Sequence, residues 1–407
     1  MWLLVGQRLD AGAPMEASLM KFLRGLPADF WPDPCKRVRE WIQEGKAPSS
    51  NTAGYSKARL QLPLSMVEQS CDHIFQQLIA QLDGGESKGT SRAFLLDGSS
   101  MRMPHNPALR KLYPPGSNQH GEAHWPILRI LVAHDLHTGL AVRPEWGAMY
   151  GPDAVSEQEL LDRAIERLPS GSTIVGDANF GVFSVAYAAT QRAHPVVLRL
   201  TPARVRRMAG EELQDGIDRT LVWKPSRGDR RGHPELPDDA CVQGRLIVRK
   251  VQPEGKKPFL LALFSTLLTS TSEAVELYGT RWTIETDLRT LKSQLHLDQL
   301  TCTTPAMVAK EIDMGITAYN LVRGMIALAS QQSGIAPRGY RFTKVRRILE
   351  IFGPELAKAP NEEAANRILD QMMRYIQQAK VPNRKRPRPS YPRAVWKTRD
   401  TFPRRKQ

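Results

Sequence analysis

Long apolar runs, clustered cysteines and nucleotide-binding glycine patterns are all missing from this chain of 407 residues. No stretch approaches the roughly 18 consecutive apolar residues that a membrane-spanning helix requires, so we expect no membrane association. The four cysteines are far apart and form no Cys-x-x-Cys pair, which argues against a structural zinc and favours a reduced, cytoplasmic protein. Walker A, Rossmann and Gly-x-Ser-x-Gly patterns are absent, so neither nucleotide-driven action nor nucleophilic-serine catalysis is indicated.

Acidic residues are also few relative to basic ones. The chain has 42 Asp and Glu and 57 Lys and Arg, which gives a net charge of +15. A surplus of this size predicts a polyanionic partner such as DNA. Residues 384–407 hold ten Lys or Arg against one Asp, with four prolines between them, and cannot build a hydrophobic core. Two interpretations of this tail remain open. It is a solubilising end, or it is an arm that binds DNA phosphates through residues such as Arg384, Lys385 and Arg386.

The most informative motif spaces a tyrosine, an arginine, a glutamate and a lysine as Y-x2-R-x3-E-x6-K. These residues are Tyr278, Arg281, Glu285 and Lys292. We predict one helix here, because at about 100° per residue all four fall within roughly 60° of a single face. A separate apolar stripe predicts the core-facing side of the same helix: Leu277, Ile284, Leu288, Leu291 and Leu295.

A glutamate between cations, in a chain this basic, indicates metal-dependent chemistry on nucleic acid. The alternative is that Glu285 only forms salt bridges along the helix with Arg281 and Arg289. Two apolar runs upstream each predict a buried strand that ends in an aspartate, at Asp97 and at Asp177. Either aspartate alone is an ordinary strand-end carboxylate. Together with Glu285 they offer an all-oxygen ligand set, which favours Mg²⁺ with Mn²⁺ as a substitute.

These motifs resemble the signatures of DDE transposases of the insertion-sequence 4 family. Members of that family read D-G-T/S after the first strand and G-D-x-x-F/Y after the second, and this chain has Asp97-Gly98-Ser99 and Gly176-Asp177-Ala178-Asn179-Phe180. Two further phrases are similar, at residues 54–59 and at residues 318–323. The resemblance thus covers residues from about 50 to about 330.

The resemblance implies an α/β fold with an RNase H-like catalytic core, in which a mixed sheet is flanked by helices. It implies that Asp97, Asp177 and Glu285 are catalytic and hold two Mg²⁺ ions, with Asp97 as the bridging ligand. Arg281 and Lys292 are then expected to bind DNA phosphates beside the cleaved bond. Tyr278 is expected to donate its hydroxyl to another phosphate oxygen.

The resemblance also implies the partners and the division of the chain. Lys57 and Arg59 are expected to contribute to recognition of the element end, and double-stranded DNA is the partner, at the transposon ends and at the target. Two protomers are expected to act as a homodimer on paired ends, in a bacterial cytoplasm at the nucleoid. We expect six segments: a helical DNA-binding domain (1–90), the first part of the core (91–200), a β-rich insertion (201–258), the second part of the core with the Glu285 helix (259–330), C-terminal helices (331–380) and the basic tail (381–407).

Local patterns predict some individual elements within these segments. Helices are expected at residues 34–44 and 64–82, and a hairpin is expected from residues 125–136 and 139–145. A further helix is expected over residues 156–168, where Ser156 and Glu159 have the spacing of a capping box.

The sequence therefore predicts a DNA transposase that cleaves at the ends of an insertion sequence and joins the free 3′-OH to target DNA. Two alternatives stay open: a catalytically idle relative that regulates by binding DNA, and a metal-dependent nuclease of the same fold. The intact set of Asp97, Asp177 and Glu285 argues against the idle relative.

Overall fold

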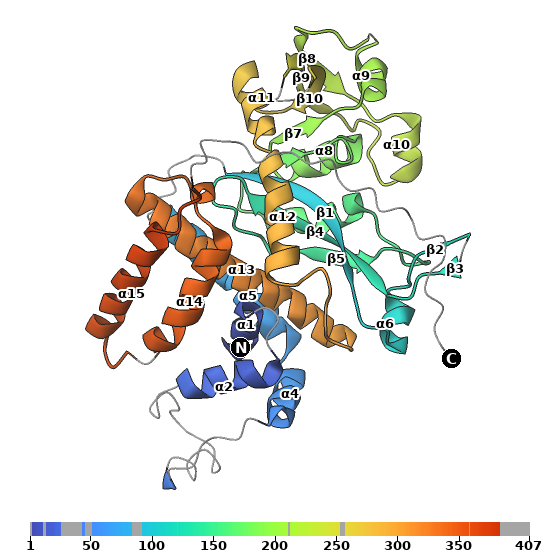
Figure 1. Ribbon diagram of the computed structural model, residues 1–407. Helices are drawn as coiled ribbons and strands as arrows, with labels where there is room; N and C mark the ends of the chain where they lie inside the picture. The colour runs from blue at the N-terminus through green and yellow to red at the C-terminus, as the bar shows by residue number, and fades with distance from the viewer. Residues whose placement is uncertain are drawn as a thin grey trace.

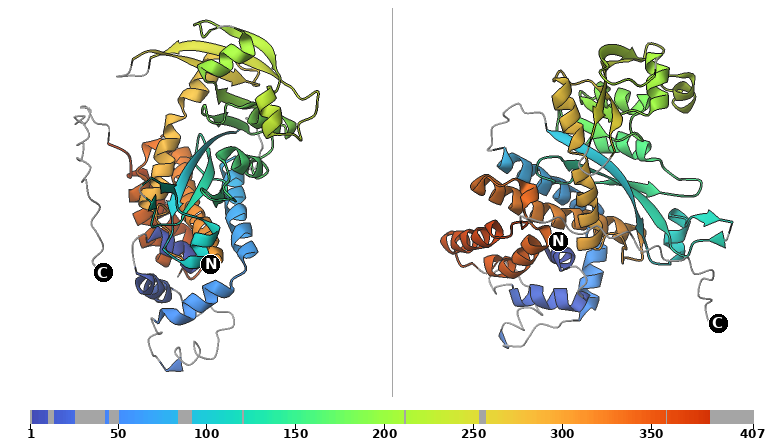
Figure 2. Two further views of the ribbon diagram at one scale, coloured as in Figure 1. Left: turned by 90° about the vertical axis from the view of Figure 1, so that its right-hand side faces the viewer. Right: turned by 45° about the horizontal axis from the view of Figure 1, so that its top comes forward.

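The structure of the protein is a computed structural model that describes residues 2–10, 14–25, 43–44, 51–83, 92–119, 121–210, 212–252, 257–357 and 359–382. A single eight-stranded sheet runs through the upper part of the molecule, and helices cover both of its faces (Figure 1). The N-terminal and C-terminal helices gather at the opposite end of the molecule from strands β8–β10 (Figure 2).

Five strands form the centre of this sheet in the order β5-β4-β1-β6-β7. Strand β4 is antiparallel to both β1 and β5, whereas β6 and β7 run parallel to β1. This order and these directions are those of an RNase H-like core, so the predicted α/β fold is confirmed. The strands are β1 (Ala93–Arg102), β4 (Ile127–Asp135), β5 (Glu145–Ala148), β6 (Thr173–Gly176) and β7 (Val196–Arg199).

Two strand predictions need correction. Strand β1 does not end at Asp97 but continues to Arg102, because β4 stays paired with it over the whole length. The hairpin predicted over residues 125–145 has its first strand as β4, but β5 starts only at Glu145. Residues 140–142 still pair with β4, because Ala141 forms an antiparallel bridge with His134 and the N–H of Val142 donates to the Ala133 carbonyl. The other edge of Ala141 bonds to the Asn320 side chain, which accepts from its N–H and donates to its C=O.

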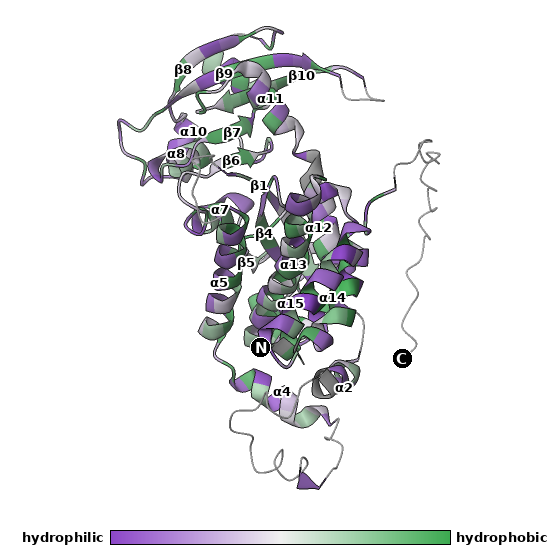
Figure 3. Ribbon diagram, turned by 90° about the vertical axis from the view of Figure 1, so that its left-hand side faces the viewer, coloured by the Kyte–Doolittle hydropathy of each residue, from purple (hydrophilic) through white to green (hydrophobic). Residues whose placement is uncertain are grey.

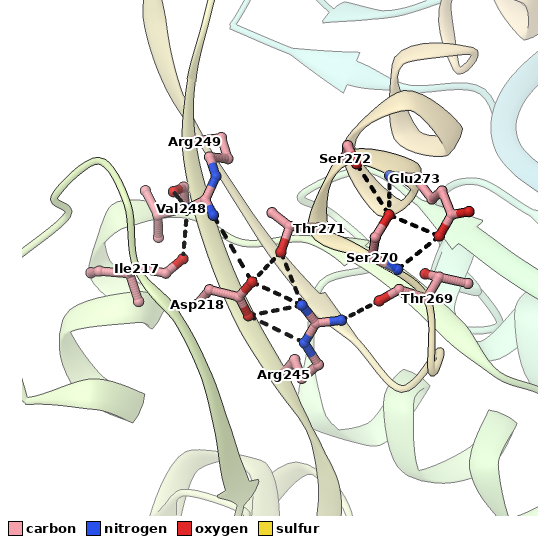
Figure 4. A network of polar contacts seen from close by, with 10 residues as sticks. All are labelled: Ile217, Asp218, Arg245, Val248, Arg249, Thr269, Ser270, Thr271, Ser272 and Glu273. Atoms are coloured by element: carbon pink, nitrogen blue, oxygen red, sulfur yellow. Dashed lines mark hydrogen bonds and ion pairs between the residues drawn. The ribbon is translucent and has the colours of Figure 1, made fainter.

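The region from residue 201 to 265 continues the same sheet. Strands β10, β9 and β8 follow β7 in that order, and every pairing is antiparallel. An ion pair between Asp218 and Arg245 (2.8 Å) joins β8 to β9, and Arg245 also donates to Thr271 at the start of helix α11 (Figure 4). The added strands therefore hold the N-terminus of α11. The elements are α9 (Pro202–Ala209), β8 (Asp218–Trp223), α10 (Arg227–Gly232), β9 (Val242–Val251) and β10 (Phe259–Ser265).

Helices α7 (Glu157–Ile165) and α8 (Phe183–Gln191) cover one face of the core strands. Side chains of α7 and α8 pack with Phe94 and Leu96 of β1 in one buried cluster. The predicted capping box of Ser156 and Glu159 is present at the start of α7 and satisfies two backbone N–H groups there. On the opposite face, Leu95 packs with α11 (Thr271–Gly279), and Met101 packs with α12 (Trp282–Gln294) and α13 (Pro305–Ser333).

The predicted signature helix is wrong as a single element. Residues 278–292 belong to two helices, α11 (Thr271–Gly279) and α12 (Trp282–Gln294). Tyr278 is therefore near the end of α11, and Arg281 is the N-cap residue of α12. Tyr278 is therefore separated from the helix that carries Glu285 and Lys292, which both belong to α12. The apolar stripe divides in the same way, since Leu288, Leu291 and Leu295 enter the large core while Leu277 packs beside Leu95.

Several of the remaining helices pack against the long helix α13, which contains many hydrophobic residues (Figure 3). Helix α13 contacts α1, α5, α14 and α15. Most of the predicted helix at residues 34–44 lies outside the described residues. Among the helices that the structure describes, none is long and apolar enough to cross a membrane. The elements not yet given are α1 (Trp2–Leu9), α2 (Met15–Gly25), α4 (Thr52–Gln61), α5 (Leu64–Leu82), α6 (Pro107–Leu112), β2 (Ser117–Asn118), β3 (Gly121–Glu122), η2 (Pro337–Gly339), α14 (Phe342–Ala357) and α15 (Glu362–Gln377).

Candidate active site

Two of the three predicted catalytic residues lie close together, one on β1 and the other directly after the neighbouring parallel strand β6. Leu95 of β1 is in register with Val175 of β6, and continuing that register by two residues sets Asp97 beside Asp177. Strand β6 ends at Gly176, so Asp177 stands where the pairing between the two strands has stopped. Its Oδ1 atom accepts a hydrogen bond from the backbone N–H of Asn179 at 2.8 Å, which fixes the carboxylate in the turn after the strand.

The environment of Asp97 disfavours its charged form. Burial is the main cause, the charges of Asp177 and Glu157 add to it, and together they raise the pKa of Asp97 to about 6. The Gly98 backbone and Arg281 act in the opposite direction but do not cancel the effect. The nearby positive groups therefore do not balance the negative charge at this edge of the sheet. A divalent cation bound by the carboxylate oxygens would balance it.

The third predicted residue, Glu285, lies on α12, and this helix packs against β1 and β4. The placement of its side chain is outside what the structure describes. Within the described part of the chain, no three Asp, Glu, His or Cys side chains form a group that could hold a metal ion. The fit to a cation therefore depends on the oxygen chemistry of Asp97 and Asp177 and on their shared location.

A cavity of about 400 Å³ opens beside Asp97, between β1 and α12. Lys292 reaches across it and donates a hydrogen bond from Nζ to Ser99 Oγ at 3.1 Å. Arg289 also lines the cavity, although the sequence suggested only a salt-bridge role for it. Two carboxylates, Asp97 and Asp298, and two cations, Lys292 and Arg289, thus line one cavity. Basic side chains of this kind can bind phosphate oxygens.

Tyr278 is closer to the core than the sequence suggested. It is 6% exposed and packs with Leu95 and Val175 in the cluster under α11. Burial raises the pKa of its phenol, and the nearby guanidinium groups of Arg281 and Arg199 reduce that effect. The Arg281 guanidinium lies 6.0 Å from the centre of the Tyr278 ring, and its charge also acts on Asp97. Arg281 is thus close both to a buried phenol and to the first aspartate.

A buried ion-pair network fixes α12, and no local sequence pattern predicted it. Asp287 is fully buried and pairs with Arg323 of α13 and with Arg338, the latter at 2.8 Å. Arg323 also donates from Nε to the hydroxyl of Tyr319 at 3.0 Å. The motif at residues 318–323 therefore holds α12 in place and is not assigned a contact with the substrate. The signal available in the sequence was the arginine four residues after a tyrosine, between the apolar residues of a long helical segment.

The residues predicted to bind DNA outside the core lie elsewhere. Lys57 and Arg59 are on α4, where Lys57 is exposed and Arg59 stacks over the Tyr55 ring at 5.7 Å. Lys310 of α13 donates to the carbonyls of Arg59 and Leu60 (2.9 and 3.1 Å) and so secures the end of α4. The tail residues Arg384, Lys385 and Arg386 lie outside the described residues.

Comparison with known proteins agrees with this geometry. The family model described as "Transposase DDE domain" matches residues 88–321, which include both aspartates and all of α12. The chain belongs to this transposase family. It is 24% identical over 318 residues to the transposase InsG for insertion sequence element IS4 of Escherichia coli (strain K12), an alignment that covers 74% of this chain and 68% of the relative. The resemblance to insertion-sequence 4 transposases is thereby confirmed.

One solved structure is also similar to this transposase. It is a cryo-EM structure of the piggyBac transposase synaptic complex with hairpin DNA, at 11% identity and a TM-score of 0.38. The match covers 72% of this chain but only 55% of the solved one, so this transposase spans about half the length of that protein.

Proposed function

We propose that this transposase cleaves DNA at the ends of an insertion sequence and joins the resulting 3′-OH to target DNA. The observation that carries the proposal is that Asp97 lines a cavity together with Lys292 and Arg289, and that the register of β1 and β6 sets Asp177 beside Asp97. Carboxylates that can bind metal ions and basic side chains that can bind phosphates thus lie close together. Membership of the transposase family gives the reaction class.

In this proposal Asp97 and Asp177 hold divalent cations together with Glu285 from α12. Mg²⁺ is the ion that such oxygen ligands favour, with Mn²⁺ as a substitute. When bound there, divalent ions would activate the attacking oxygen and neutralise charge on the leaving oxygen. Lys292 and Arg281 hold the phosphates on either side of the cleaved bond, so the reacting atoms stay in line.

The partners follow from the same arrangement. The net charge of +15 suits double-stranded DNA, both at the element ends and at the target. Lys57 and Arg59 on α4 are assigned to recognition of the element end, and the 384–407 tail to non-specific affinity. Two copies of the chain are proposed to act together, because strand transfer of an element requires that its two ends be held at once.

Single substitutions of the three carboxylates test this function. Asp97→Ala, Asp177→Ala and Glu285→Ala should each abolish Mg²⁺-supported cleavage of a transposon-end substrate, with end binding in gel shifts retained, because each removes a cation ligand and no phosphate contact. Wild-type cleavage by any one variant would show that its residue is wrongly assigned. A wild-type protein that binds ends without cutting would support the idle regulator, and cutting without joining would support the nuclease.

A further inference from the structure

Ser99 and Lys292 are joined across the cavity of the candidate active site, although they lie 193 residues apart in the chain. The Lys292 ammonium donates from Nζ to Ser99 Oγ at 3.1 Å, and both side chains are half-buried. A lysine side chain has many rotamers, so its ammonium stays at one point only if a fixed partner holds it. The hydroxyl of Ser99 is such a partner, on the same strand as Asp97.

The direction of β1 turns Ser99 toward α12. Side chains alternate along a strand, and Met101, two residues after Ser99, packs with α12 in the large core. A Cβ atom built on Gly98 would instead overlap the carboxylate of Glu157, the first residue of α7, on the other face of the sheet. Asp97 and Ser99 therefore face α12 together, about 7 Å apart along the strand.

Helix α12 holds Lys292 opposite this strand. Leu288 of α12 and Leu295 at its C-terminal end belong to the same buried cluster as Met101. Residues 288, 292 and 295 are four and three positions apart, so Lys292 lies between the two leucines on one helix face. On the other side of the contact, β4 stays paired with β1 at Ser99. Both partners of the hydrogen bond are therefore carried by elements that are packed in place.

The partner that Ser99 offers to the lysine is neutral. Among the residues that the structure describes, no carboxylate forms an ion pair with Lys292. Asp298 lines the same cavity, but its ion pair is with Arg102, at 3.8 Å. A hydroxyl oxygen accepts a hydrogen bond from an ammonium without neutralising its charge. The positive charge of Lys292 is thus held in place and remains available to a phosphate.

We propose that Ser99 is a positioning residue of this transposase, whose hydroxyl holds the Lys292 ammonium in place for the DNA phosphate beside the cleaved bond. This inference rests on the proposed function, which assigns Lys292 to that phosphate. The hydroxyl then acts on the rate of the chemical step and acts through Lys292. The competing explanation is that Lys292 reaches the phosphate equally well without the hydroxyl, because its side chain is long and flexible.

The test compares single-turnover cleavage of a transposon-end duplex by the full chain with Mg²⁺ and end binding without metal, measured by fluorescence anisotropy. Ser99→Ala should cut about 10- to 100-fold more slowly, because the phosphate is held less accurately. Its end affinity should stay within about 3-fold of the wild-type value, because the charge of Lys292 remains. Ser99→Thr keeps the hydroxyl and should restore the rate. The matched control is Ser100→Ala, the next residue of β1 and on the opposite face, which should cut at the wild-type rate.

A double variant shows whether Ser99 acts through the lysine. Adding Ser99→Ala to Lys292→Ala should slow cleavage no further, because the hydroxyl then has no ammonium to hold. The positioning role is overturned if Ser99→Ala cuts at the wild-type rate, if Ser99→Thr is as slow as Ser99→Ala, or if Ser99→Ala costs the same factor with and without Lys292. These results leave the proposed function standing. A wild-type chain that binds the end and does not cut it would overturn the proposed function and this inference with it.

Discussion

Asp287 of α12 and Arg323 of α13 form an ion pair in which the aspartate is fully buried and the arginine is 4% exposed. Asp287 follows Glu285 by two residues, so this pair fixes the helix that carries the third predicted catalytic carboxylate. Arg338 approaches the same carboxylate from the short helix η2. Three segments therefore meet at one buried charge.

Removing that charge should destabilise the protein strongly. In Asp287→Asn, Arg323 remains buried without a counter-charge, and such a change costs about 3–5 kcal/mol in the free energy of unfolding. Cleavage should fall as well, because α12 loses its attachment to α13. The control is Glu363→Gln, which removes an exposed ion pair with Arg367 and should change the free energy of unfolding by no more than about 0.5 kcal/mol. Similar effects of the two substitutions in urea unfolding would contradict the role of Asp287.

The sequence predicted what short-range patterns determine. Helix α5 has the predicted bounds of residues 64–82, and the capping box at Ser156 was readable from two residues three apart. The proximity of Asp97 and Asp177 followed from the resemblance, and in the structure Asp97 lies on β1 while Asp177 directly follows β6, the parallel strand paired with it.

Other features depend on contacts between distant segments and could not be read locally. The helix break after Gly279 interrupts a continuous helical pattern, and the end of β1 is set by the length of β4. In the sequence, Asp287 has the pattern of a solvent-exposed charge. Its partner in the structure, Arg323, lies 36 residues later in the chain. Glu157 has the position of an ordinary first-turn acid, and only the neighbouring strand shows what it touches.

A second prediction concerns stability against pH. Asp313 of α13 is fully buried, and burial raises the pKa of its carboxyl from 3.8 to about 7, with Glu68 and Asp72 adding to the shift and Arg143 opposing it. The folded protein therefore retains a proton that the unfolded chain has released between these pH values. Stability should fall as pH rises through that window and stay reduced above about pH 7.

Asp313→Asn should remove this dependence. The variant should match the wild type near pH 4 and exceed it at pH 8, with Tm higher by about 2–4 °C for each kcal/mol recovered. Thermal unfolding of both proteins at several pH values measures the difference. If the difference in Tm between the wild type and Asp313→Asn is the same at pH 8 as at pH 4, this carboxyl is not protonated in the folded protein.

The third prediction separates phosphate contacts from cation ligands. Lys292→Ala and Arg281→Ala each remove a charge-assisted contact worth about 1.5–3 kcal/mol, so binding to a transposon end should weaken about 10- to 150-fold. Mn²⁺ binding without DNA should stay close to the wild-type value, because neither side chain is a cation ligand. Arg367→Ala, which removes an exposed charge on α15, is the matched control for net charge. Loss of Mn²⁺ binding in either variant, or unchanged end binding in both, would refute the phosphate assignment.

The last prediction concerns the tail of residues 384–407, which holds ten of the basic residues. If this segment lies along DNA phosphates, its deletion leaves several phosphates with their counterions still bound. On duplex DNA, each phosphate that the protein neutralises contributes about 0.9 to the steepness of the plot of log affinity against log salt. The truncated chain should therefore show a slope that is flatter by several units. The ratio of affinities for transposon-end and random duplexes should not change, because binding to phosphates carries no sequence information. Fluorescence anisotropy with both duplexes across a series of salt concentrations gives the two quantities together. An unchanged salt slope would assign the tail to solubility alone, whereas a lower end-to-random ratio would mean that the tail itself reads sequence.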